Sequence, residues 1–166
     1  MSAYKFLAAG AIGPLSRFVW PAPGIWVEAS GPLVLCKVGV HVCRAHELAH
    51  WIHDELWELE IAGDELAGID CAVVRRARLV RRIDGWTEGG HQRFAAACVA
   101  RARELADGKL AELVDDAVGA AEGGFPAVAA YTAALVVARL APDPEAAYAR
   151  ERAWQSTWIA DQLIRV

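Results

Sequence analysis

The first half of the chain consists of short apolar runs that alternate with turn residues. Valine, isoleucine, tryptophan and leucine dominate these runs, and glycine or proline separates them, as at Gly13-Pro14 and Gly31-Pro32. This pattern is typical of short strands joined by turns. It predicts strands at residues 4–8, 25–29, 33–37, 40–43 and 56–62.

The segment 56–62 has the clearest alternation. Acidic side chains dominate one set of alternate positions, with Glu58 and Glu60, whereas the other set is wholly apolar. Because successive side chains of a strand point to opposite faces, we expect one face of this strand to be buried and the other to be solvated. Residues 45–55, which precede it, predict a short helix.

Residues 71–83 are ambiguous, because their apolar positions fit either a strand or a helix. We favour a strand. The arginines of this segment would either bind an anion such as phosphate or balance the carboxylates of residues 55–70 on a solvated surface, and charge runs usually have the second role. They are Arg75, Arg76, Arg78, Arg81 and Arg82.

After Trp86 the turn residues become rare and the apolar spacing becomes helical. Asp107-Gly108 marks a helix end, and Asp143 is a plausible N-terminal cap ahead of a proline suited to the first helical position. The pattern predicts helices at 91–106, 109–121, 126–140 and 144–164.

These elements predict an α+β fold. We expect a small mixed or antiparallel sheet with one short helix in residues 1–86, followed by three or four helices in residues 87–166 that pack on it. A chain of 166 residues is long enough for a single domain with a full core. We therefore expect the two regions to form one compact domain.

Composition and charge narrow the classes of partner. Hydrophobic residues make up 55% of the chain and charged residues 23%, as in folded globular proteins. A net charge of −4 gives no general attraction to nucleic acid or anionic membranes. Glycine and proline interrupt the N-terminal apolar run, unlike in a secretory signal, and residues 125–138 fall short of the roughly 20 residues that span a bilayer. We expect a cytoplasmic protein, in which the cysteines are free thiols or metal ligands. Its partner would be a small molecule or a protein, and the sequence leaves the oligomeric state open.

Residues 36–53 hold the densest chemistry, with two of the four cysteines and four of the five histidines. Within them His46-Glu47-Leu48-Ala49-His50 matches the HExxH pattern, in which two histidines hold zinc and the glutamate serves as base. On an α-helix, positions four apart share a face, so His46 and His50 would bind one ion while Glu47 activates its water. A zinc-dependent hydrolase is therefore one hypothesis.

Two observations weigh against the hydrolase. A catalytic zinc needs a third protein ligand, and no HxxGxxH extension follows the motif. Chance alone would also place HExxH in about one chain in 70 of this composition. The spacing of the surrounding acidic residues singles out no third ligand.

A closed structural zinc site is an alternative use of the same segment. Cys36, His41 and Cys43 would be ligands, with His46 or His50 as the fourth. His41 and Cys43 point to the same face of a strand, which favours joint ligation. The spacing differs from that of standard zinc knuckles, and buried thiols with a hydrogen-bonded histidine would explain the same residues.

Several segments, over residues 4–86, resemble an uncharacterised domain of bacterial and phage proteins that is sometimes found ahead of pentapeptide repeats. The resemblance rests on YKFL, Trp20-Pro21, LCKVGVHVC, ELWELEIAG and VVRRARLVRRI. It implies a Cys-x-x-Gly-x-His-x-Cys strand, a helix and a strand near a Glu-x-Glu pair, with Val40 in place of the usual residue before the histidine. The resemblance implies that the HExxH motif is peculiar to this chain, and it implies no enzymatic activity. It draws attention to the residues that match the pattern of the domain, which are Cys36, His41, Cys43, Glu58 and Glu60.

The order of elements also resembles the NAD-binding half of ADP-ribosyltransferases. That resemblance implies that His41 would hold the ribose and that Glu58 or Glu60 would activate the acceptor, although the His-Gly-Thr and Ser-Thr-Ser signatures are missing. Three hypotheses follow: a non-catalytic binding or regulatory domain, which we favour, a zinc hydrolase, and a nucleotide-dependent transferase.

Overall fold

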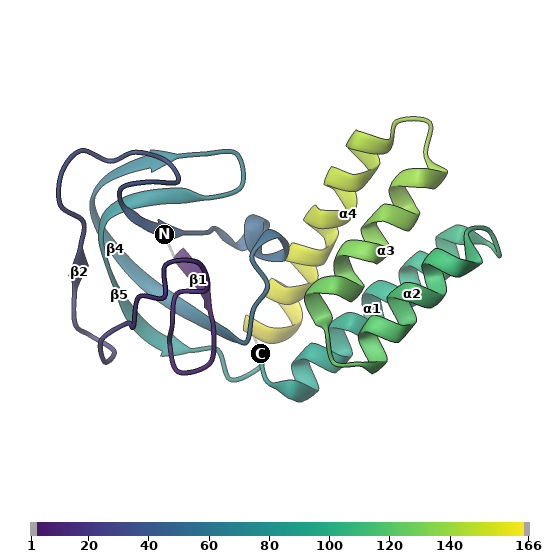
Figure 1. Cartoon of the computed structure of the whole chain (residues 1–166), viewed down its shortest axis with the longest axis horizontal. Helices are drawn as coiled ribbons and strands as arrows, with labels where there is room; N and C mark the ends of the chain where they lie inside the picture. The colour runs from purple at the N-terminus through teal and green to yellow at the C-terminus, as the bar shows by residue number, and fades with distance from the viewer. Residues whose placement is uncertain (1–2, 165–166) are drawn as a thin grey trace. The chain divides into compact units, whose positions relative to one another are not determined.

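The computed structural model describes residues 3–164 and confirms the α+β fold (Figure 1). The chain divides into two compact units, Met1–Asp84 and Gly85–Val166. The first contains the strands and the second contains the α-helices. Within the described residues, no helix combines the length and the apolar character that crossing a membrane requires.

The N-terminal unit is an antiparallel sheet of five strands. β4 and β5 form a long hairpin at its centre, which Figure 1 shows as two extended arrows. β1 pairs with β4, while β2 and β3 both pair with β5. The bounds are β1 Ala3–Leu7, β2 Val27–Glu28, β3 Val40–Val42, β4 Glu55–Ala67 and β5 Ala72–Arg82, with the 3₁₀ helix η1 at Ala45–His50.

Backbone hydrogen bonds close the sheet into a ring of strands. The Tyr4 N–H donates to the Cys43 carbonyl at 2.8 Å, and the Cys43 N–H donates to the Tyr4 carbonyl at 2.9 Å. This bridge joins β1 to the end of β3, which is already paired through β5 and β4 to β1. The ring encloses one apolar core, formed by Ala3, Leu7, Trp20, Val40, Val42, Leu59, Ala72, Val74, Ala77 and Leu79.

A bulge lets β4 curve around this core. The register of β4 against β5 shifts between Ala62 and Glu65, and Gly63 lies in that gap with φ +80°. A Cβ atom at Gly63 would lie 2.7 Å from the Cβ of Arg75. Both the left-handed backbone and the close approach therefore require glycine at this position.

The C-terminal unit contains four α-helices: α1 Glu88–Ala106, α2 Ala111–Glu122, α3 Pro126–Leu140 and α4 Pro144–Ile159. A π-helical turn, η2, follows at Ala160–Ile164. The Asp143 side chain accepts a hydrogen bond of 3.1 Å from the Ala146 N–H, which confirms it as the cap of α4. Fully buried alanines of α3, such as Ala130 and Ala134, let neighbouring helices of this unit pack closely.

Three predictions from the apolar pattern need correction. Residues 33–37 form a turn rather than a strand, because Val34 pairs with Val38 and Cys36 adopts φ +61°, which reverses the chain. The helix predicted at 45–55 ends at His50, because Glu55 already belongs to β4. The strand predicted at 25–29 is reduced to Val27–Glu28, which pairs with β5 over only two residues.

Candidate functional site

The two histidines of the HExxH segment lie on η1, a 3₁₀ helix. A 3₁₀ helix has about three residues per turn, so positions four apart are rotated by about 120° from one another. His46 and His50 therefore do not share one face as they would on an α-helix. The His46 side chain is 75% exposed.

Glu47 is held in a helix cap. Its side chain is buried, and Oε2 accepts a hydrogen bond of 2.6 Å from the Arg44 N–H, as the third residue of a capping box. Oε1 lies 3.8 Å from Nε2 of His46. Glu47 therefore stabilises the start of η1 by accepting the Arg44 N–H.

His41 and Lys5 meet where the ring of strands closes. Lys5 is half-buried on the same row of β1 as Ala3 and Leu7, and its Nζ donates a hydrogen bond of 2.6 Å to the His41 carbonyl. Burial lowers the pKa of Lys5 to about 8, against the opposing effect of the Cys43 and Cys71 thiols. Burial and the Lys5 charge lower the pKa of His41. The imidazole is therefore neutral near pH 7.

Cys43 is a buried thiol of the core. Its Sγ lies 3.3 Å from the Tyr4 carbonyl, to which it donates, and burial raises its pKa to about 12. A thiol held protonated in this way is a poor nucleophile and a poor metal ligand. Cys36, by contrast, is exposed in the turn between Val34 and Val38.

The predicted metal ligands do not assemble. Among residues 3–164, no group of three or more histidine, cysteine, aspartate or glutamate side chains is arranged to hold a metal ion. Neither the hydrolase set (His46, His50 and a carboxylate) nor the structural set (Cys36, His41 and Cys43) forms such a group. Cys43 instead lies in the core and His41 is half-buried, whereas Cys36, His46 and His50 are exposed.

Glu58 and Glu60 pair with arginines of the neighbouring strand. Glu58 accepts from Nε of Arg81 at 2.8 Å, and Glu60 accepts from Nε of Arg78 at 2.8 Å. The Arg78 guanidinium also lies 4.7 Å from the ring centre of Trp26, and Arg76 lies 4.8 Å from the same ring. Both carboxylates line a shallow hollow with other side chains of this face. The arginine run thus balances the acidic face of β4, as charge runs usually do.

The sequence interpretation missed an ordered apolar loop at residues 13–19. Its ends are tied by hydrogen bonds from the Gly13 N–H to the Phe18 carbonyl and from the Arg17 N–H to the Gly13 carbonyl, at 2.8 and 2.9 Å. Leu15 is 90% exposed, Val19 64% and Phe18 45%. Glycine and proline in this stretch indicated a turn, but which of its apolar residues face solvent depends on tertiary structure.

Two anchors fix this apolar loop to the sheet. Trp20, which follows it, is buried in the core and contacts Phe18 edge-on, with ring centres 6.0 Å apart. Glu55 accepts hydrogen bonds from the Gly10 and Ala11 N–H groups at 3.1 and 3.2 Å. Burial opposes ionisation of Glu55, but hydrogen bonds from Trp57 and these backbone groups lower its pKa overall, so the carboxylate stays charged.

Comparison of the chain with protein-family models, curated proteins and solved structures finds no match. The resemblance of residues 4–86 to a bacterial and phage domain therefore stays a prediction.

Proposed function

We propose that the N-terminal unit is a non-catalytic protein-binding domain and that the apolar loop at residues 13–19 is its contact surface. The observation that carries this proposal is the exposure of Leu15, Phe18 and Val19 on a loop whose backbone is fixed at both ends. Exposed apolar patches commonly mark interaction sites. A loop that is already ordered loses little conformational entropy on binding.

The contacts of the predicted catalytic residues support a binding role over an enzymatic one. Glu47 caps η1, and Glu58 and Glu60 pair with arginines. His41 lies on β3, and its carbonyl accepts a hydrogen bond from the half-buried Lys5 ammonium. The three carboxylates each have a structural role, and no observation specifically favours the hydrolase or the transferase.

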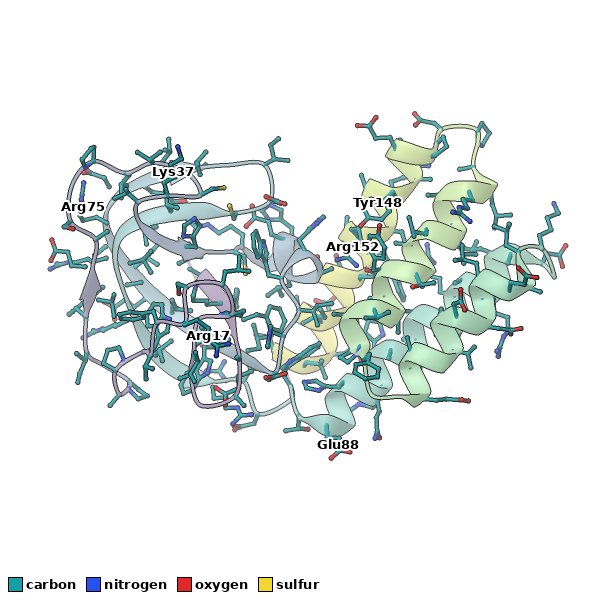
Figure 2. All side chains as sticks on the ribbon, in the orientation of Figure 1. Arg17, Lys37, Arg75, Glu88, Tyr148 and Arg152 are labelled. Atoms are coloured by element: carbon teal, nitrogen blue, oxygen red, sulfur yellow. The ribbon has the colours of Figure 1, made fainter. Side chains whose placement is uncertain are left out.

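The charge of the loop indicates the chemistry of the partner. Arg17 is the one charged residue between Lys5 and Glu28, so the contact surface is apolar with a single cation (Arg17 is labelled in Figure 2). An apolar protein segment that carries a carboxylate would complement this surface. We also propose a cytoplasmic location, because all four cysteines are free thiols.

The experiment is a selection of random peptides displayed on phage against the full chain, followed by affinity measurements on synthetic copies. We expect apolar peptides with aspartate or glutamate to be selected. The double substitution Leu15→Ser, Val19→Ser should weaken their binding by about tenfold or more, since a few central apolar contacts dominate such interfaces. Arg17→Asn, which tolerates the left-handed backbone of this position, should reduce the preference for acidic peptides.

The matched control is Leu105→Ser, which removes an exposed leucine from α1 in the other unit. This variant should bind the selected peptides as tightly as the wild type. Failure to select any peptide above a blank surface would contradict the proposal, and so would equal binding by the loop variant and the wild type.

A further inference from the structure

Cys36, a ligand of the predicted zinc site, and Cys71, which belongs to no predicted site, lie in two neighbouring segments of the N-terminal unit. Cys36 occupies the turn between Val34 and Val38, next to Lys37, which Figure 2 labels. Cys71 immediately precedes β5 and is buried. The Gly68 N–H donates to the Cys71 carbonyl at 2.7 Å, which fixes the loop that leads into β5.

The two segments touch one another. A Cβ atom built on Gly68 would lie 3.3 Å from Cδ2 of Leu35 and 3.7 Å from Sγ of Cys71. The side chain of Leu35, the neighbour of Cys36, therefore flanks the same point as the Cys71 sulfur. Electrostatics agree with this placement, because burial, Asp70 and then Cys36 raise the pKa of Cys71. The contact of Leu35 with Gly68 therefore brings the turn that carries Cys36 against the loop that carries Cys71.

The two thiols differ in access. Cys36 is exposed and has φ +61°, an uncommon backbone conformation for a residue with a side chain. Cys71 is buried, so a bulky reagent in solution meets Cys36 first. An exposed thiol beside a second, less accessible thiol is the arrangement that resolves a mixed disulfide into an internal one.

We propose that Cys36 and Cys71 form a reversible internal disulfide with each other. The oxidant is a low-molecular-weight disulfide such as oxidised glutathione, which reacts by thiol–disulfide exchange. The Cys36 thiolate attacks one sulfur of that disulfide, forms a mixed disulfide and releases one small thiolate, which takes up the proton that Cys36 lost. The Cys71 thiol then loses its proton, a step that its raised pKa slows near pH 7, and attacks the Cys36 sulfur. The second small thiol leaves with that proton. Two protein thiols are oxidised and one small disulfide is reduced to two thiols.

The disulfide would pin the turn of Cys36 to the loop before β5. Because the bond spans a long stretch of chain that includes β3, η1 and β4, it restricts the unfolded chain. We expect the oxidised protein to unfold at a temperature higher by about 5 °C. This inference is independent of the proposed binding function, because its readouts are a covalent bond and a melting temperature.

The test treats the full chain with oxidised glutathione, blocks remaining thiols and maps the peptides by mass spectrometry. We expect a cross-linked peptide pair that contains Cys36 and Cys71 and disappears on reduction with dithiothreitol. Cys36→Ser should abolish the cross-link without loss of folding, because the residue is exposed. Cys71→Ala should instead accumulate the glutathione adduct on Cys36. Cys98→Ala, in the helical unit, should leave the cross-link unchanged.

Three results would overturn the inference. The first is a stable glutathione adduct on Cys36 of the wild type with no cross-link to Cys71. The second is a cross-link from Cys36 to a different cysteine. The third is that all four cysteines remain free thiols after prolonged exposure to oxidised glutathione.

Discussion

Glu47 shows how a residue with catalytic potential takes a structural role. The carboxylate is buried and accepts the Arg44 N–H, so the backbone at the start of η1 has the partner that it needs. The same segment carries His46 and His50, but the 3₁₀ geometry rotates them apart. The chemistry of single side chains was therefore readable from the sequence, whereas their mutual placement was not.

We expect Glu47→Ala to lower the free energy of unfolding by about 1 to 2 kcal/mol, through the loss of a capping interaction. Glu47→Gln should lose much less, because its amide oxygen still accepts the Arg44 N–H. Urea titrations of both variants measure the difference. Equal destabilisation by alanine and glutamine would contradict the capping role.

Lys5 is a partly buried charged residue that the sequence analysis did not single out. Its strand carries apolar residues at alternate positions, and Lys5 interrupts the row of Ala3 and Leu7. That interruption was a signal in the sequence. Its partner, the His41 carbonyl, belongs to a distant part of the chain, and only the closure of the ring brings the two together.

At the scale of elements, the alternation of residues 56–62 correctly predicted a strand, and residues 71–83 proved to be its hairpin partner. The helices after Trp86 also follow the apolar pattern, and α3 has the predicted bounds. The failure at residues 33–37 has a local cause, because one residue with positive φ converts an apolar run into a turn. Such a conformation in a cysteine leaves no mark in the hydrophobic pattern.

We expect Gly63→Ala to destabilise the N-terminal unit by about 2 to 3 kcal/mol, because the methyl group would enter the position of the Arg75 side chain and strain a left-handed backbone. Gly24→Ala is the matched control. Gly24 also has a positive φ, at +89°, but its Cβ would meet nothing within 4 Å. That variant should lose only about 1 kcal/mol, from backbone strain.

Urea titrations separate the two contributions at Gly63. A loss at Gly63 no greater than the loss at Gly24 would show that the β4 bulge tolerates a side chain.

At the scale of the whole molecule, buried thiols make stability depend on pH. Burial raises the pKa of Cys43 to about 12 and also raises the pKa of Cys71 and Cys98 above 9.0, the value that an unfolded chain would show. Above pH 9 the unfolded chain therefore loses thiol protons that the folded chain retains. Stability contributed by these groups is present below pH 9 and falls as the pH rises through that value. Lys5, with a lowered pKa, acts in the opposite direction between about pH 8 and 10.5.

We expect Cys43→Val to lose about 1 kcal/mol less stability than the wild type between pH 9 and pH 10, which is the contribution of one thiol with an unfolded pKa near 9. Urea titrations at pH 7, 8, 9 and 10 measure the slope. Parallel curves for the variant and the wild type over this range would contradict the assignment of a protonated, buried Cys43 thiol.

The sequence by itself determined the class of fold and most of its elements, because hydrophobic periodicity and turn residues act over a few neighbouring positions. It also identified residues 36–53 as the densest cluster of reactive groups. Tertiary structure decided what those groups do: η1 is a 3₁₀ helix, Cys43 is buried in the core, and Cys36 lies in an exposed turn. It also decided that the apolar residues of the loop at 13–19 remain at the surface. The physical reason is that burial, pairing and access depend on contacts between residues far apart in the chain, which no local pattern encodes.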